Sequence, residues 1–364
     1  MSDDTPEEDG LRYAELLRAG ELAGRELAGA DLTEADLQGT DLHDSALLEV
    51  VLTGARLAGA DLSSASLREC DLSSADLSNV RAPGIRVLSS RLVGAVIQRA
   101  VLDDARLAEC DLAGIDGRYS SLARTSVNNC LASEACLAGV NLSQAVLAGT
   151  QLSKAVLSRA QFRGGSLTAV LLEGAVAAET NLTACEIRDS DFTGITAPGS
   201  LFPKALLAGV IATHADLSRC DFSGATVVDS TFERSTFWRS TFIGSRFNNC
   251  SFEFADLRSI EALESDFTAT SFVGADLRGA RLHRCVLRDV DFYWADLTDC
   301  EFLDCDTAGA RFPDPVQIAY GPPGTAPPLV PPVPLYRARA TEEEYRALLS
   351  SCLNSDLEEQ DTPR

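Results

Sequence analysis

The chain has 364 residues, of which 45% are hydrophobic, and its formal net charge is −23. The hydrophobic content excludes a disordered polyanion, and the charge excludes direct electrostatic binding to nucleic acid or to an anionic membrane. Two explanations of the acidity stay open, namely attraction of a basic protein partner and solubility alone.

The first segment, residues 1–20, is acidic and contains one short helical pattern. Its opening residues lack the basic start and the apolar run of a signal peptide, and no later stretch is apolar for long enough to span a bilayer. We therefore expect a cytoplasmic protein without membrane contact. Asp9 predicts the N-cap of a helix over about residues 10–19, with Gly20 ending it. This helix would cover the open end of the segment that follows.

A repeat of five residues fills the second segment, residues 21–312. In one frame from Leu22 to Phe312, 51 of 59 positions carry Leu, Ile, Val or Phe, and we name these 59 positions centres. The residue two places before each centre is nearly always small, and the residue between is often Asp or Asn. A period of five fits neither a helix nor a strand. We predict a chain that turns every five residues, with the centres and small residues inside.

Repeats such as Ala30-Asp31-Leu32-Thr33-Glu34 resemble the pentapeptide-repeat family, whose pattern is Ala-(Asp/Asn)-Leu-x-x. The resemblance implies an all-β fold, a right-handed quadrilateral β-helix with four repeats of five per coil. The 59 repeats then make between 14 and 15 coils. At the strand spacing of ~4.8 Å per coil, they form a rod about 70 Å long.

Two departures from the repeat predict local differences. Fourteen of the fifteen Phe residues stand at centres and crowd the C-terminal half, where we expect a thicker core. Small residues replace the usual centre at Ala82, beside Pro83 and Gly84, and at Ala197, before Pro198 and Gly199. We expect local bulges at these two places.

The frame stops after Phe312. Residues 313–340 are rich in proline and predict an extended linker. Thr341 and Glu344 form a capping-box pattern within the last segment, residues 341–364, where a short amphipathic helix precedes a disordered tail. The apolar stripe of that helix consists of Tyr345, Leu348, Leu349, Cys352 and Leu353. The stripe either folds back on the repeats or meets another chain.

The residues that carry chemistry predict no catalytic, cofactor-binding or metal-binding site. Nine of the eleven Cys residues occupy the small inward position, where a thiol acts as a small buried hydrophobe. No Cys-x-x-Cys pair is present for zinc, and neither is a glycine-rich phosphate loop. The three His residues are too far apart along the coil to cooperate. A filled interior also lacks a cleft, so we expect no enzyme.

The outward residues of the repeat are mostly polar, and two groups of residues depart from this. The first is aromatic and consists of Trp238, Phe254, Tyr293 and Trp294. Exposed aromatic groups mark a contact surface, which either the C-terminal helix of this chain or a foreign partner would cover. The second group is apolar where Asp or Asn is usual, and consists of Val96, Val101, Leu131, Val146, Val156, Leu171, Val176, Leu201, Leu206 and Ile211. Either strands tolerate such residues, or this surface forms a homodimer or binds another protein.

Two functions follow as hypotheses. The first is a non-enzymatic scaffold that binds a protein partner of unknown identity through its surface. The second is implied by the resemblance, because some family members are acidic mimics of B-form DNA that bind DNA gyrase and protect it from inhibitors. The acids that would carry this mimicry are Asp31, Asp36, Asp61, Asp71, Asp76, Asp276, Asp291 and Asp296. Residues 21–312 hold 40 acids and 25 bases, a net charge of −15. This net charge is about a third of that of a DNA duplex of equal length.

Overall fold

The computed structural model describes residues 22–313, which belong to two compact units that divide between Leu171 and Leu172. We name residues 22–171 unit 1 and residues 172–313 unit 2. Both consist of short strands and turns, and the described residues contain no helix. The two predicted helices, and the linker from residue 314 onward, lie outside the described residues.

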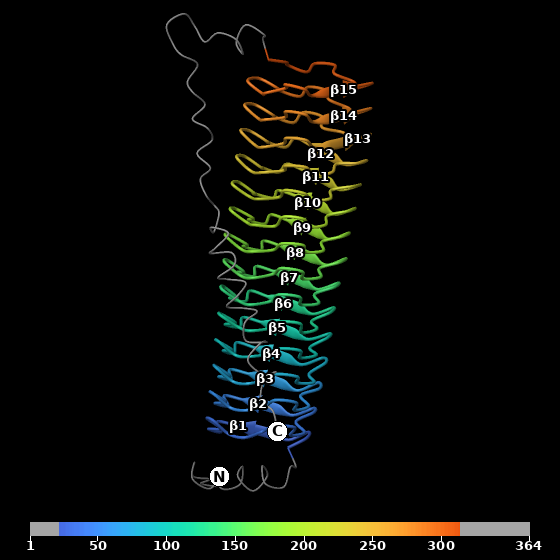
Figure 1. Ribbon diagram of the computed structural model, residues 1–364. Coiled ribbons are helices and arrows are strands. Elements are labelled where there is room, and N and C mark those ends of the chain that lie inside the picture. Colours follow the sequence, from blue (N-terminus) through green and yellow to red (C-terminus); the bar gives the residue numbers. More distant parts are fainter. Residues whose placement is uncertain (1–21, 314–364) are drawn as a thin grey trace, which may run out of the picture. The chain divides into compact units, whose positions relative to one another are not determined.

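Each strand is three residues long. In both units, strands that follow one another within one sheet lie side by side and pair in parallel (Figure 1). Unit 1 contains β1 (Glu26–Ala28), β2 (Ala46–Leu48), β3 (Ser66–Arg68), β4 (Arg86–Leu88), β5 (Arg106–Ala108), β6 (Ser126–Asn128), β7 (Val146–Ala148) and β8 (Ser166–Thr168). Unit 2 contains β9 (Glu186–Arg188), β10 (Leu206–Ala208), β11 (Thr226–Val228), β12 (Arg246–Asn248), β13 (Glu261–Leu263), β14 (Arg281–His283) and β15 (Glu301–Leu303).

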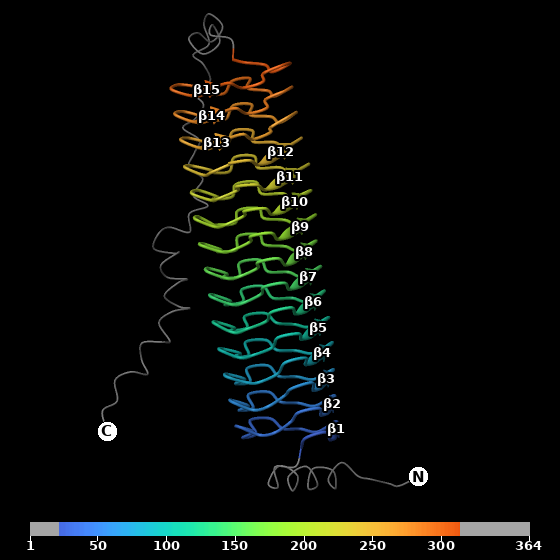
Figure 2. The same cartoon turned by 90° about the vertical axis from the view of Figure 1, so that its right-hand side faces the viewer.

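The coil has four sides, and each side is one repeat of five. Leu27 of β1 lies opposite Leu47 of β2, which is four repeats further along the chain. The other sides keep the same interval, as in the bridge between Asp31 and Val51. Hydrogen bonds join adjacent coils, since the Leu32 N–H donates to the carbonyl of Val51 at 2.7 Å and the Val51 N–H donates to that of Ala30 at 2.9 Å. Each unit is a parallel, four-sided β-solenoid, which confirms the predicted fold class (Figure 2).

In unit 2 the strand moves to a neighbouring side of the coil. β13 begins three repeats after β12 instead of four, and β13 to β15 form a separate sheet. The bridges between Thr241 and Glu261 and between Arg246 and Asp266 nevertheless keep the four-repeat register. The frame of five is therefore unbroken, and only the side that forms a regular strand has changed.

Every corner contains one residue in the left-handed region. From Gly24 to Gly309, each fifth residue has a positive φ, which makes 58 positions, 20 of them Gly. None of the other 38 is β-branched or proline, because those side chains are the least tolerant of this conformation. The backbone geometry of the corner therefore restricts which residue types occur at this position, the fourth after each small inward residue.

The outward Asp stabilises the corner that follows it. At corners such as that of Leu72, the backbone bonds among the described residues leave the N–H of the next residue, Ser73, without a carbonyl acceptor. The Asp71 carboxylate accepts this N–H at 2.9 Å, and Asp266 does the same for Thr268. A backbone donor left without a partner is costly, so the recurrent Asp or Asn has a structural cause.

The bulges predicted at Ala82 and Ala197 are absent, and this prediction is wrong. At Ala82, the turn closes with the Ile85 N–H donating to the Ala82 carbonyl at 3.2 Å, and Gly84 has a φ of 69°. Pro at the second position and Gly at the third are the residues that a type II turn requires. Pro83-Gly84 and Pro198-Gly199 therefore fit the regular corner.

The cores of the two units differ in chemistry. The centres of unit 1 are almost all aliphatic, whereas unit 2 contains ladders of buried Phe. Phe202, Phe222 and Phe242 stack on one side at centroid distances of 4.6 and 5.5 Å. On another side, Phe252 and Phe272 stack at 5.2 Å. The Phe rings predicted to fill the C-terminal core are therefore mostly buried, while the greater thickness of that core stays a prediction.

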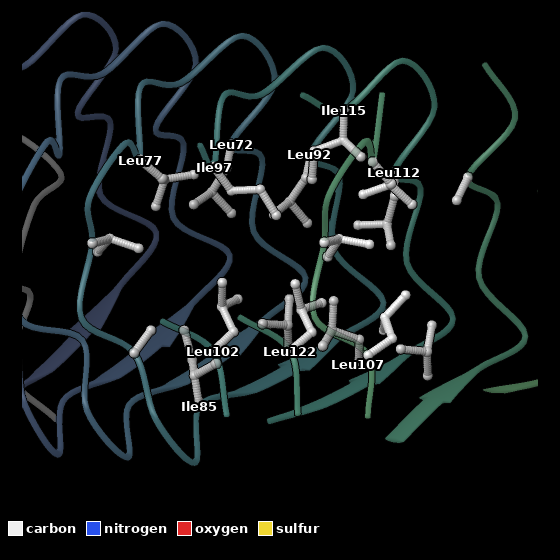
Figure 3. Close-up of a pocket in the computed structure, with 18 of the residues that line it drawn as sticks. Leu72, Leu77, Ile85, Leu92, Ile97, Leu102, Leu107, Leu112, Ile115 and Leu122 are labelled. Atoms are coloured by element: carbon white, nitrogen blue, oxygen red, sulfur yellow. The ribbon is translucent and has the colours of Figure 1, made fainter. Parts of the chain in front are cut away.

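The interior of unit 1 is not completely filled, contrary to the expectation of a solid tube. Figure 3 shows rows of Leu and Ile side chains that face one another across an elongated cavity of about 70 Å³. Ala82 and Ala132 are the small centres in its lining. Branched aliphatic side chains and small centres leave space along the axis, because they lack the bulk of the Phe rings in unit 2.

Candidate interaction surfaces

Unit 1 exposes large apolar side chains on several sides of its coil. Leu131 and Leu171 lie two coils apart on one side with Gln151 between them, and Leu171 is 40% exposed. Val146 begins β7 on the neighbouring side, and Val101 lies on a third side. All four are exposed. The structure brings Leu131 and Leu171 together, while the other two point in different directions.

In unit 2 three of the four predicted apolar residues occupy one coil. Leu201, Leu206 and Ile211 begin three consecutive sides, and Leu206 opens β10. Leu201 and Ile211 are exposed and Leu206 is half-buried. They form an apolar band around part of that coil.

Four residues of the predicted apolar group are not exposed. Val156 is buried, at 3% exposure, and so is Val176, while Val96 and Leu206 are half-buried. The prediction that all of the group face solvent is wrong for these residues. The frame of five determines that a side chain points away from the core, but it does not determine whether solvent reaches that side chain.

Two of the four predicted aromatic residues form a stacked pair. The ring centres of Tyr293 and Trp294 lie 4.9 Å apart with an interplanar angle of 20°, and Trp294 is 57% exposed. The Arg311 guanidinium lies 5.6 Å from the Tyr293 ring centre. Phe254 lies on the side of Trp294 two coils earlier, and its ring covers Gly274, where an added Cβ would be 2.6 Å from it.

Trp238 is separate from that pair. Its described contacts are with the guanidinium groups of Arg219 and Arg239, which lie 5.0 and 4.5 Å from the ring centre. Phe254 has a similar contact, since the Arg234 guanidinium lies 5.4 Å from its ring centre. The predicted aromatic group is therefore divided by position, with the stacked Tyr293 and Trp294 in one place and Trp238 in another.

The candidate acids of unit 1 alternate with other residues from coil to coil. Asp36 pairs with Arg56 at 2.7 Å, and Asp61 pairs with Arg81 at 3.6 Å, each on the next coil. Asp76 lies on the other side of Arg56 in the same ladder. Val51 separates Asp31 from Asp71 in the ladder that contains these two.

The candidate acids of unit 2 are all ion-paired. Arg278 lies 2.6 Å from Asp276 and 3.6 Å from Asp296, while Arg311 lies 2.9 Å from Asp291. These pairs reduce the field that the carboxylates project into solvent. No row of unopposed carboxylates that would resemble a phosphate backbone forms from the candidate acids.

Reactive groups of the described residues are dispersed or buried. Seven of the nine inward Cys side chains are buried as predicted, whereas Cys300 and Cys305 are half-buried. The thiol of Cys70 donates to the Leu47 carbonyl of the preceding coil at 3.4 Å. Between residues 22 and 313, no three His, Cys, Asp or Glu side chains are placed to hold a metal ion. That part of the chain also has no helix of the length and hydropathy needed to cross a membrane.

Comparison of the sequence with protein families finds pentapeptide repeats in eight copies, over residues 17–47, 45–81, 135–174, 202–239 and 265–302. No curated protein is significantly similar to the chain. The family match extends over parts of both units.

Solved structures of pentapeptide repeat proteins resemble the chain as well. HetL, involved in heterocyst differentiation regulation in the cyanobacterium Nostoc sp. strain PCC 7120, is 22% identical over 83% of this chain and 96% of its own, with a TM-score of 0.18. QnrB1, a plasmid-mediated fluoroquinolone resistance protein, is 20% identical over 57% of this chain and 90% of its own, with a TM-score of 0.22. At these values the likenesses carry no argument about function.

Proposed function

The chain belongs to the pentapeptide-repeat family, and on that premise we propose that it is a non-enzymatic scaffold that binds a protein partner through the outside of its coils. The observation that carries this proposal is the exposure of large apolar side chains at positions where the repeat usually places Asp or Asn. Leu131 and Leu171 in unit 1 are the leading pair.

Replacing the outward Asp with Leu has a cost at the corner. A carboxylate or amide that accepts an exposed backbone N–H at such a position contributes about 1 kcal/mol by analogy with helix caps. Leu171 forgoes this contribution and also exposes apolar surface. Side chains that weaken the fold in this way at an exposed position support a role in binding.

The stacked pair of unit 2 supports a second contact region. Trp, Tyr and Arg are the residue types that most often dominate the energy of protein interfaces. Trp294 presents an exposed ring, and its neighbour Tyr293 is held by stacking and by Arg311. The pair is therefore partly ordered before a partner arrives, which lowers the entropic cost of binding.

The partner that fits these features has an apolar patch for Leu131 and Leu171, where residues 117–180 hold three acids and five bases, and basic residues further away, opposite the acidic remainder of the coils. The net charge of −15 over residues 21–312 favours association with a basic protein and accelerates the encounter. A second copy of this chain would carry the same negative charge, so a homodimer is the less favoured occupant.

The experiment compares Leu171→Asp with the matched control Gln151→Asp, which adds the same charge one coil away on the same side. Because Gln151 lies between Leu131 and Leu171, a second control, Asn141→Asp, adds the charge on another side of the coil. We expect a partner purified with the wild-type chain to be lost from Leu171→Asp, weakened by Gln151→Asp and by Trp294→Ala, and retained by Asn141→Asp. Equal recovery with all four variants, or a chain that sediments as a monomer without any partner, would contradict the proposal.

The DNA-mimic hypothesis is the second candidate, and the acidic surface is the observation that favours it. The ion pairs of Asp36, Asp61, Asp276, Asp291 and Asp296 count against it. A DNA gyrase supercoiling assay separates the two functions. We expect neither inhibition of supercoiling nor protection from an inhibitor, and either effect would favour the mimic.

We place this function in the cytoplasm. The thiols of Cys110 and Cys130, one coil apart in unit 1, are buried, and a reducing compartment would keep them in the thiol form. Fractionation of cells that express the chain tests this placement, and recovery from an oxidising compartment would contradict it.

A further inference from the structure

The cavity of unit 1 has an unusual lining. It runs from Leu62 to Leu152 and consists of Leu, Ile, Val and Ala side chains, with Thr150 as the one residue that carries a polar group. The Thr150 hydroxyl donates to the carbonyls of Val127 and Ala148 at 3.2 and 3.3 Å. Its hydrogen-bonding capacity as a donor is therefore used in the wall.

Water is poorly stabilised in such a cavity. A buried water needs two to four polar partners, and cavities lined only by Leu, Ile and Phe side chains stay dry and bind benzene or xenon instead. Because the wall of this cavity offers at most one polar partner, the Thr150 hydroxyl oxygen, we expect it to be dry. An empty apolar cavity also lacks the dispersion contacts that a guest atom would restore.

The shape of the cavity restricts the guest. The lining from Leu62 to Leu152 covers four to five coils, or roughly 20 Å at the strand spacing. Averaged over this length, a volume of about 70 Å³ corresponds to about five to seven water-sized atoms. A thin chain of atoms matches a small volume spread over this length better than a compact ring does.

We propose that the interior of unit 1 is a binding site for a thin, unbranched apolar molecule, the class of a short linear hydrocarbon. The facing rows of Leu72, Leu92 and Leu112 on one side and Leu102 and Leu122 on the other form the walls that contact it (Figure 3). This site is internal and independent of the outer surfaces assigned to a protein partner.

The first test uses the full-length chain with xenon as an atomic probe and n-pentane as the linear probe. In crystals pressurised with xenon, we expect density along the row of lining side chains in unit 1. In solution, n-pentane should shift the methyl NMR signals of lining residues such as Leu102 and Leu122, while Leu277 and Leu287 of unit 2 stay unchanged. Cyclohexane, which is wider, should shift neither set.

Filling variants decide whether the effect arises in the cavity. Ala132→Leu places the usual centre at a position that lines the cavity, and we expect it to weaken the n-pentane response at least tenfold. Ala82→Leu is an independent filling variant should the first fold poorly. Ala212→Leu, a centre of unit 2 outside this lining, is the control and should leave the response of unit 1 unchanged.

Three results would overturn the proposal. The first is a wild-type chain without xenon density in unit 1. The second is a response to cyclohexane equal to that to n-pentane, since the cavity would then not select linear molecules. The third is an undiminished n-pentane response in folded Ala132→Leu and Ala82→Leu.

Discussion

Units 1 and 2 are built on the same frame of five and differ in what fills it. The centres of unit 1 are aliphatic and line a cavity, whereas those of unit 2 include ladders of Phe rings that stack from coil to coil. The four-repeat register and the left-handed corner residue are the same in both. Corner geometry therefore sets the fold, and the centres set how tightly its interior is packed.

The difference arises because stacking suits the coil spacing. The ring centres of Phe252 and Phe272 lie 5.2 Å apart, and the rings are tilted by only 8°, so their separation is close to the strand spacing of ~4.8 Å. A planar ring fills each level and contacts its equivalents above and below. Branched aliphatic side chains occupy less of each level, so that space remains along the axis.

The largest effect is expected from removing a ring. Phe242 is fully buried, and its ring centre lies 5.5 Å from that of Phe222 and 5.1 Å from that of Phe247. We expect Phe242→Ala to reduce the free energy of unfolding of unit 2 by ~3–5 kcal/mol, and Leu107→Ala, which widens the cavity of unit 1, by ~2–3 kcal/mol. Amide hydrogen exchange resolved by unit measures each loss, since repeat proteins need not unfold in two states.

Phe242→Leu is the control, since it removes the ring but keeps an apolar side chain, and its loss should be smaller than that of Phe242→Ala. Equal losses for Phe242→Ala and Leu107→Ala would mean that the two cores are equally well packed, contrary to the difference in how their centres fill the coil.

Replacing a corner glycine with alanine is expected to reduce the free energy of unfolding by a smaller amount, and by the same amount in both units. Gly59 and Gly244 have φ values of 69° and 62°, and a Cβ at either position would meet no atom within 4 Å. Gly59→Ala and Gly244→Ala should each destabilise by ~1 kcal/mol, from backbone strain alone. Urea denaturation measures both changes.

Gly274→Ala should cost more than either, because its Cβ would lie 2.6 Å from the Phe254 ring. Adding Phe254→Ala should recover the excess. The losses in free energy of unfolding caused by Gly59→Ala and Gly244→Ala should agree within about 1 kcal/mol, since the strain of an alanine at these φ values is the same. A larger difference would contradict an equal corner geometry in the two units.

The smallest effect concerns pH and is confined to unit 1. The hydrogen bond between His43 Nδ1 and the Asp41 carboxylate, at 2.6 Å, raises the pKa of the His43 imidazole above its usual 6.5. The stabilisation from protonated His43 is thus complete below about pH 6.5 and is lost as the pH rises through the folded-state pKa. NMR titration should show a His43 pKa above 6.5 that falls in Asp41→Asn, where Asp44 and Asp61 still raise it slightly. A wild-type His43 that titrates at the usual value would contradict this.

Most of the fold follows from the repeat, because the centres and the small residues report directly on which side chains are inside. The frame from Leu22 to Phe312 predicts the regular turns, the inward position of the Cys series and the Phe-rich core of unit 2, while the four sides of the coil follow from the family resemblance. The bulge prediction fails at Ala82 because it treats Pro83-Gly84 as an interruption of the repeat, when this is the residue pair best suited to a type II corner.

The surfaces follow less directly from the sequence, for two physical reasons. Solvent exposure depends on what lies beside a residue, which is why Val156 is buried although its position in the frame is outward. Charge at a surface depends on partners one coil away, such as Arg56 for Asp36. One signal was available in the sequence and missed, namely the absence of β-branched residues and proline from every corner position between Gly24 and Gly309.

The equivalence of the four sides has a consequence for how such a chain tolerates insertions and deletions. Deleting one repeat of five within either unit would leave the frame of centres intact, so the core could still form. All later outward residues of that unit would, however, turn by one side of the coil. If the deletion fell between Leu131 and Leu171, these two residues would no longer share a side. Insertions or deletions of a whole coil preserve every surface, and those of one, two or three repeats generate new combinations of side chains on an unchanged framework.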